Sequence, residues 1–179
     1  MVNHKIVVSG PVGAGKSTAI RSVSDSPALT TDFAATDATC AVKELTTVAL
    51  DHGAFDLDGG DRVLLFGTPG QDRFDFMWEI LSEGATGLIL LIPNDHFKPL
   101  AELRLFVRTF ASLVRPADIA VGVTQTDCCD VPSLDDYRHA LAALGLPHLP
   151  VQAVDARNPD DVRALILMLL ERRADRVTA

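Results

Sequence analysis

Residues 10–17 read GPVGAGKS, and they directly follow the apolar run KIVVS at residues 5–9. The apolar run has the length of a buried strand, and helical sequence follows over about residues 15–23. The glycine-rich turn between them fits the pattern G-x-x-x-x-G-K-[ST]. Glycines let backbone N–H groups converge on an anion without Cβ clashes, and the helix directs its positive dipole end at the same point. The stretch therefore predicts a phosphate-binding loop.

The side chains of this loop have distinct roles in holding a nucleoside triphosphate. Lys16 is expected to reach the β- and γ-phosphates and to act in catalysis, and the Ser17 hydroxyl to ligate Mg²⁺. A flexible glycine turn with an incidental lysine is the alternative, but the preceding strand and the following helix argue against it. The residues expected to contact the nucleotide here are Gly10, Val12, Gly13, Ala14, Gly15, Lys16, Ser17 and Thr18.

Short apolar runs alternate with longer amphipathic segments along the rest of the chain, which is typical of β–α units. The turn Asp58-Gly59-Gly60-Asp61 indicates that the runs on either side of it pair antiparallel. Neither a repeat nor a linker interrupts residues 1–179. We expect a single α/β domain, a P-loop NTPase fold with a mostly parallel six-stranded sheet and helices on both faces. The expected strands are residues 5–9, 46–55, 62–66, 87–92, 119–124 and 148–153, and the expected helices are residues 15–23, 74–81, 100–114, 133–144 and 159–173.

The charge balance excludes some classes of partner. The chain of 179 residues carries 16 Lys+Arg against 24 Asp+Glu, a formal net charge of −8. Nucleic acid and anionic membranes would repel such a surface, so neither is an expected partner.

The cysteines and the ends of the sequence favour a cytoplasmic protein. Cys40, Cys128 and Cys129 have neither a disulfide framework nor the spacing of a zinc site, so reduced thiols are expected. The sequence starts without an apolar signal region, and Val2 stands where myristoylation would need glycine. We expect no direct membrane insertion.

Residues 66–74, FGTPGQDRF, resemble the switch II region of Ras-like small GTPases, whose usual form is D-x-x-G-Q. Residues 46–51, TTVALD, precede it at about the spacing of switch I. The chain is similar over essentially its whole length to bacterial Ras-like proteins, namely the gliding-polarity and actinobacterial-type small GTPases that work with roadblock-domain proteins. The resemblance implies a GTP-binding switch with Mg²⁺ as cofactor, which slowly hydrolyses GTP to GDP. It also implies a roadblock-type regulator or another protein effector at the switch regions.

The resemblance assigns roles within these two segments. Thr47, or its neighbour Thr46, would sense the γ-phosphate and ligate Mg²⁺. Gly70 would donate its backbone N–H to the γ-phosphate, and Gln71 would orient the attacking water. Arg73 would either reach the phosphates as an intrinsic arginine finger or cap the switch at the surface.

One departure concerns the metal. The aspartate that opens D-x-x-G, which holds Mg²⁺ through water, is Gly67 here. Metal binding is then weaker, or a carboxylate such as Asp32, Asp37 or Asp51 substitutes.

A second departure concerns the base. The N-K-x-D motif of the family corresponds to residues 124–127, TQTD, where Asp127 keeps the carboxylate that accepts from guanine N1–H and N2–H₂. Adenine lacks this arrangement of donors and would leave a carboxylate unpaired. Gln125 loses the stem and charge of lysine, and Thr124 in place of asparagine is expected to weaken the local scaffold. The Ala156 backbone N–H would meet the guanine O6.

Two other functions remain open at this point. A P-loop ATPase or small-molecule kinase would also use residues 10–17, but the sequence shows no arginine-rich lid. A non-hydrolysing pseudo-GTPase would explain both Gly67 and the altered base motif. Likewise, Phe74 and Trp78 belong either to the core or to a face that a partner covers.

Overall fold

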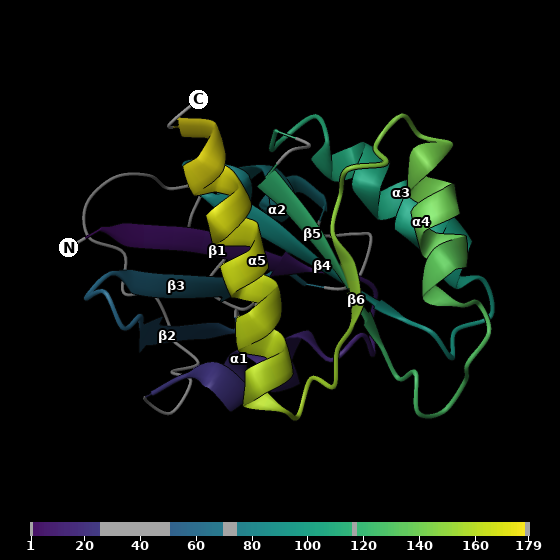
Figure 1. Ribbon diagram of the computed structural model, residues 1–179, viewed down its shortest axis with the longest axis horizontal. Coiled ribbons are helices and arrows are strands. Elements are labelled where there is room, and N and C mark those ends of the chain that lie inside the picture. Colours follow the sequence, from purple (N-terminus) through teal and green to yellow (C-terminus); the bar gives the residue numbers. More distant parts are fainter. Residues whose placement is uncertain (1, 26–50, 70–74, 116–117, 178–179) are drawn as a thin grey trace.

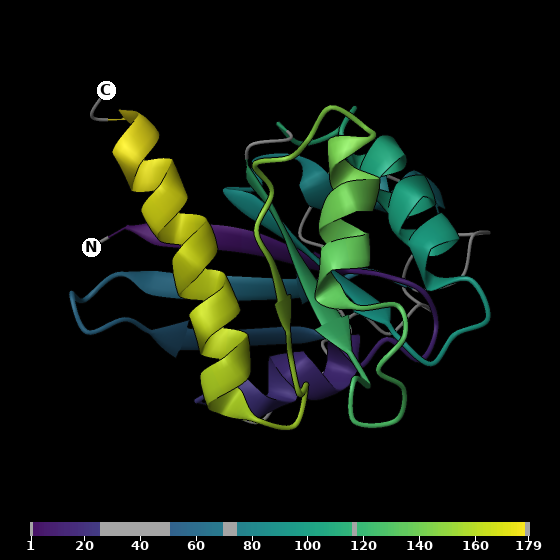
Figure 2. The same cartoon turned by 45° about the vertical axis from the view of Figure 1, so that its right-hand side comes forward.

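The computed structural model describes residues 2–25, 51–69, 75–115 and 118–177. Their strands form one six-stranded sheet in the order β2-β3-β1-β4-β5-β6 (Figures 1 and 2). Neighbouring strands pair parallel, apart from the antiparallel β2–β3 pair. The antiparallel hairpin predicted from the Gly-Gly turn is therefore confirmed. The strands are β1 Asn3–Ser9, β2 His52–Asp56, β3 Arg62–Gly67, β4 Gly87–Pro93, β5 Ile119–Thr124 and β6 Val151–Ala153.

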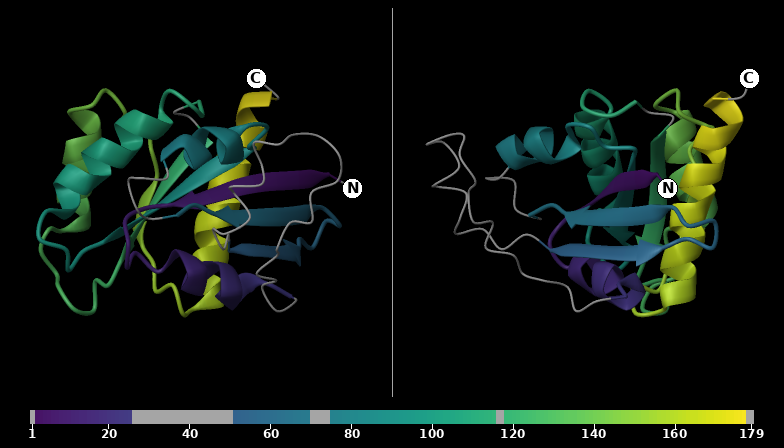
Figure 3. Two further views of the ribbon diagram at one scale, coloured as in Figure 1. Left: turned by 180° about the vertical axis from the view of Figure 1, so that it is seen from behind. Right: turned by 90° about the vertical axis from the view of Figure 1, so that its left-hand side faces the viewer.

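Helices cover both faces of this sheet. On one face α1 and α5 pack through Ile20 and Leu165 against β1, β3 and β4. On the other, α2, α3 and α4 pack through Trp78, Phe106 and Leu141. In the right-hand view of Figure 3, α5 and α2 lie on opposite sides of the molecule. The predicted architecture is confirmed. The helices are α1 Lys16–Val23, α2 Asp75–Ser82, α3 Pro99–Phe110, α4 Leu134–Ala142 and α5 Pro159–Val177.

The central strands are apolar along their whole length because both of their faces are covered. Every residue of β4 (GLILLIP) and of β5 (IAVGVT) is buried. Parallel strands between two helical layers have this composition, whereas a half-solvated strand would alternate apolar and polar residues. The two strands fix the position of the loops that follow them at their carboxyl ends.

Trp78 belongs to the core. Its side chain is 4% exposed, and its ring stacks on Phe110 with the centroids 5.2 Å apart. Its indole N–H donates to the carbonyl oxygen of Pro69 at 3.3 Å. Of the two open interpretations of this tryptophan, the structure supports core packing. Phe74 lies outside the described residues.

None of the helices in the described part of the chain is both long and apolar enough to span a membrane.

Candidate functional site

The glycines of the loop at residues 10–15 are required by close packing. Gly10 has φ +144°, and a Cβ there would lie 2.0 Å from the backbone oxygen of Leu91. Gly15 has φ +86°, and its Cβ would lie 2.9 Å from the Cβ of Ala156. L-residues rarely adopt such φ values, and neither position has room for a side chain. The loop is thus held between the end of β4 and the segment that follows β6.

Lys16 folds back over this loop. It is 9% exposed, and its ammonium donates to the carbonyl oxygens of Gly10 at 2.8 Å and Pro11 at 2.7 Å. Burial lowers the pKa of Lys16 to about 8, although the nearby Asp51 carboxylate partly opposes this shift. The structure therefore holds a partly desolvated cation against the loop, where an anion would stabilise its charged form.

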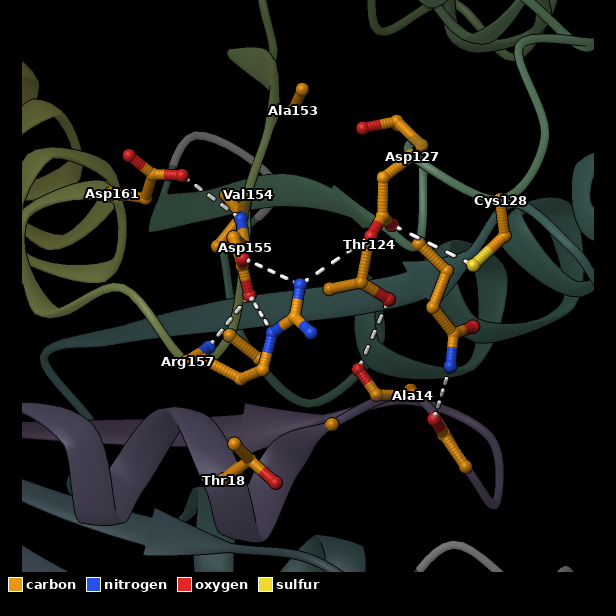
Figure 4. Close-up of a pocket in the computed structure, with 15 residues that line it drawn as sticks. Ala14, Thr18, Thr124, Asp127, Cys128, Ala153, Val154, Asp155, Arg157 and Asp161 are labelled. Carbon is orange, nitrogen blue, oxygen red and sulfur yellow. Dashed lines mark hydrogen bonds and ion pairs between the residues drawn. The ribbon is translucent and has the colours of Figure 1, made fainter.

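A cavity of about 470 Å³ opens beside the loop (Figure 4). Its size is within the range of roughly 300–1,000 Å³ that is usual for small-molecule sites. It is bounded by three segments far apart in the sequence: the loop with the start of α1, the turn after β5 and the turn after β6. Predicted site residues that line it together are Gly13, Ala14, Gly15, Thr18, Thr124, Gln125, Asp127 and Ala156. Gly10, Lys16 and Ser17 lie along the neighbouring part of the loop, and Val12 is exposed at its tip.

Thr124 and Gln125 bind the turn after β5 to the loop. The Thr124 hydroxyl donates to the carbonyl oxygen of Ala14 at 3.1 Å, and this bond is buried (Figure 4). Gln125, with φ 58°, donates from Nε2 to the carbonyl oxygen of Gly13 at 3.3 Å. The Thr124 hydroxyl thus makes a buried hydrogen bond between the two walls of the cavity, and the expectation that threonine is a weaker scaffold than asparagine stays a prediction.

A buried asparagine supports the same turn from behind. Asn94 donates from Nδ2 to the carbonyl oxygen of Cys129 at 2.6 Å and from its backbone N–H to that of Thr124 at 2.9 Å. Its Oδ1 accepts from the hydroxyl of Tyr137 at 2.8 Å. Burial raises the pKa of Tyr137 and keeps it a donor. Sequence reasoning missed both residues, since no local motif connects them with the turn.

Arg157 lies between two carboxylates at the cavity. Its Nη2 is 3.4 Å from Asp127 Oδ2 and 2.8 Å from Asp155 Oδ2 (Figure 4). Hydrogen bonds from the Arg157 side chain lower the pKa of Asp155 to about 2. The guanidinium therefore bridges Asp155 and Asp127, and the Asp127 side chain, which is 65% exposed, is held next to the cavity. Sequence reasoning missed Arg157, and its place directly after Ala156 was the available signal.

Ser17 contacts a carboxylate. Its hydroxyl donates to Oδ2 of Asp51, which directly precedes β2, and Oδ1 of Asp51 lies 3.9 Å from Nη2 of Arg21. Mg²⁺ takes hydroxyl, carboxylate, water and phosphate oxygens and needs few protein ligands, so Ser17 and Asp51 fit it. The described residues hold no group of three or more His, Cys, Asp and Glu suited to a metal. A cage made by protein side chains alone is therefore not found in that part of the chain.

Several predicted residues lie outside the described part of the chain. These are the switch residues Thr46, Thr47, Gly70, Gln71 and Arg73, together with Asp32 and Asp37. Their roles stay predictions.

Comparisons with known proteins establish the fold. No protein-family model and no curated protein matches the sequence. Among solved structures, the chain is similar to the G domain of the FeoB iron transporter of T. maritima, with a TM-score of 0.69 and 14% sequence identity. The match covers 96% of this chain and 99% of that one. At this identity the likeness shows a single α/β domain with the fold of a G domain.

Proposed function

We propose that this protein binds guanine nucleotides and hydrolyses GTP slowly to GDP and phosphate, as a molecular switch. The observation that carries the proposal is the cavity of about 470 Å³ in which the loop at residues 10–15 and the carboxylate of Asp127 meet. A ligand that fills it has phosphates at one end and a base with paired N–H donors at the other. Guanine nucleotides have this chemistry.

The phosphate end uses groups that are already in place. The glycine loop and the start of α1 offer N–H groups to phosphate oxygens, and Lys16 exchanges its carbonyl partners for them. Mg²⁺, when bound beside Ser17, would neutralise developing phosphate charge. Gln71 and Arg73 complete the proposal for hydrolysis on the strength of the resemblance at residues 66–74.

The base end distinguishes guanine from adenine. Asp127 lies beside the cavity next to Arg157, and its carboxylate offers two oxygens that accept hydrogen bonds. Guanine N1–H and N2–H₂ satisfy both of its oxygens, whereas adenine has an acceptor at N1 and no amino group at C2. This observation favours a GTPase over an ATPase or kinase.

The partner is proposed from the resemblance alone. A roadblock-type regulator or another effector would contact residues 46–51 and 66–74, which γ-phosphate binding orders in switch proteins of this class.

Single-turnover hydrolysis tests the proposed reaction. Purified protein loaded with GTP and Mg²⁺ is expected to form GDP over minutes to hours, since intrinsic GTPase rates without a partner's arginine are on the order of 10⁻⁴–10⁻² s⁻¹. Chromatography of the bound nucleotide follows the conversion. Bound GTP that persists unchanged for days would instead indicate the non-hydrolysing module.

The pH dependence of binding follows from Lys16. Phosphates stabilise the ammonium, so its pKa in the complex is higher than the value of about 8 in the free protein. Between those two pKa values binding takes up a proton, and GDP affinity should fall by up to about tenfold per pH unit above pH 8. Titration calorimetry in buffers of different ionisation enthalpy measures both the affinity and the proton uptake. An affinity that stays flat between about pH 8 and 9.5 would contradict this assignment of Lys16.

A further inference from the structure

The β2–β3 hairpin places Asp51 directly opposite Gly67. The register pairs His52 with Phe66, and the next pair along the ladder is Asp51 with Gly67. The Gly67 N–H donates to the Asp51 carbonyl oxygen at 2.8 Å, which confirms the pairing. Side chains of directly opposed residues in an antiparallel pair lie on the same face of the sheet. A carboxylate at either position would therefore stand on the same face.

The face has no spare room for a second side chain at position 67. A Cβ on Gly67 would lie 3.1 Å from the Cβ of Asp51 and 3.0 Å from Cδ1 of Ile20. Both distances are tighter than ordinary contacts, so an aspartate there would press on its neighbours. The missing side chain of Gly67 thus leaves space for the side chain of Asp51.

Asp51 uses that space to reach the first turn of α1. Its Oδ2 accepts the hydroxyl of Ser17, and its charge acts on the adjacent Lys16. The Asp51 side chain is 30% exposed, so the carboxylate borders both the loop and solvent. An oxygen ligand for a hydrated cation needs such a position, since Mg²⁺ keeps several of its waters.

We propose that Asp51 is the carboxylate that holds the divalent cation together with Ser17, in place of the aspartate that Gly67 replaces. The inference rests on the proposed nucleotide site. A hydroxyl whose oxygen binds a cation becomes a stronger donor, and Asp51 accepts that hydrogen bond through Oδ2. Its Oδ1, which lies 3.9 Å from Nη2 of Arg21, would accept from metal-bound water. The acidic side chain thus stands at the residue before β2 instead of at the end of β3, and both positions lie on the same face of the hairpin.

A purely structural role makes a different prediction. The carboxylate could serve only to hold Ser17 and to favour the N-terminal end of α1 by its charge. An asparagine at position 51 keeps an oxygen that accepts the Ser17 hydroxyl, so Asp51→Asn would then leave the Mg²⁺ dependence unchanged. Under the proposal it removes the charge that the cation needs.

The experiment measures how much fluorescent GDP stays bound to the full chain as the Mg²⁺ concentration is raised. In Asp51→Asn the Mg²⁺ concentration for half-maximal retention should rise by about 10–100-fold, because outer-shell partners of a metal contribute that much to its affinity. Affinity in EDTA should stay within about twofold of the unmodified protein, because the phosphate and base contacts remain. Asp56→Asn is the matched control, since this exposed carboxylate at the far end of β2 pairs with Arg62 at 2.9 Å.

A double variant that places the carboxylate at position 67 instead of position 51 provides a second, independent test. Asp51→Gly should show the same weakened Mg²⁺ dependence, and adding Gly67→Asp to it should return the half-maximal concentration toward the original. An Asp51→Asn protein that binds GDP with unchanged Mg²⁺ dependence would overturn the inference and leave the nucleotide site standing. Failure of the unmodified, folded protein to bind GDP would overturn both.

Discussion

Replacing Lys16 with alanine is expected to weaken GDP binding by about two to four orders of magnitude. Lys16 is 9% exposed, and its ammonium is already directed at the loop, where it donates to the carbonyl oxygens of Gly10 and Pro11. Each hydrogen bond between charged groups contributes about 1.5–3 kcal/mol, and two to phosphate oxygens account for roughly 10²–10⁴-fold in affinity. Titration with a fluorescent GDP analogue measures the loss.

Lys5 is the matched control for this prediction. Its ammonium also donates to a backbone carbonyl, that of Glu83 at 2.6 Å, but from the opposite end of β1. Lys5→Ala should therefore keep GDP affinity within about threefold, the scatter of a surface substitution of up to 0.5 kcal/mol. Thermal unfolding shows whether both variants remain folded. A folded Lys16→Ala protein that binds GDP within tenfold of the original would contradict the phosphate role.

Removing the carboxylate of Asp127 is expected to abolish the preference for GDP over ADP. A site built around hydrogen bonds to a substrate rejects an analogue that lacks them by up to about 10⁴–10⁵-fold, because its polar groups are left unpaired. The Asp127→Ala protein has no carboxylate to accept hydrogen bonds from the base, so GDP and ADP should bind to it within about tenfold of each other. Competition against fluorescent GDP gives both affinities.

Asparagine at position 127 sharpens this test. Its amide nitrogen would face guanine N2–H₂ donor to donor, whereas xanthine has a carbonyl oxygen there, so Asp127→Asn should prefer xanthosine diphosphate. Asp130→Asn, at an exposed carboxylate three residues later, is the control and should keep the guanine preference. A guanine preference that survives in Asp127→Ala would assign base recognition to other residues.

The sequence was sufficient for the fold where local patterns and tertiary packing agree. The apolar runs at residues 87–92 and 119–124 became β4 and β5, buried on both faces. Ser133 and Asp136 form the expected cap of α4, with the Ser133 backbone N–H donating to Asp136 at 2.8 Å. In such places the signal for a strand or a helix end lies within a few neighbouring residues.

The ends of helices and strands were predicted less well, because buried apolar residues also occur just outside these elements. The strand expected over residues 148–153 pairs only over Val151–Ala153, although Leu149 is buried in the core without being part of a strand. The helix expected to reach residue 114 ends at Phe110, yet Val114 is 7% exposed. An apolar residue that packs from a turn has the same sequence pattern as one that packs from a helix or strand.

The site could be predicted only where one segment contains the whole signal. The glycine loop was recognisable because strand, turn, lysine and helix are contiguous. Asp51 was one of three carboxylates that sequence could not separate, since its place beside Ser17 depends on the pairing of β2 with β3. Arg157 was missed because its contact with Asp127 joins turns 30 residues apart.

Direct comparison of GDP and ADP binding to the unmodified protein, in Mg²⁺, tests the central claim that this cavity is a guanine-nucleotide site. The account predicts that GDP binds at least about tenfold more tightly than ADP, since adenine presents an acceptor at N1 and no amino group at C2 to the Asp127 carboxylate. Equal binding, or a preference for ADP, would contradict it and move the protein to the ATPase or kinase class.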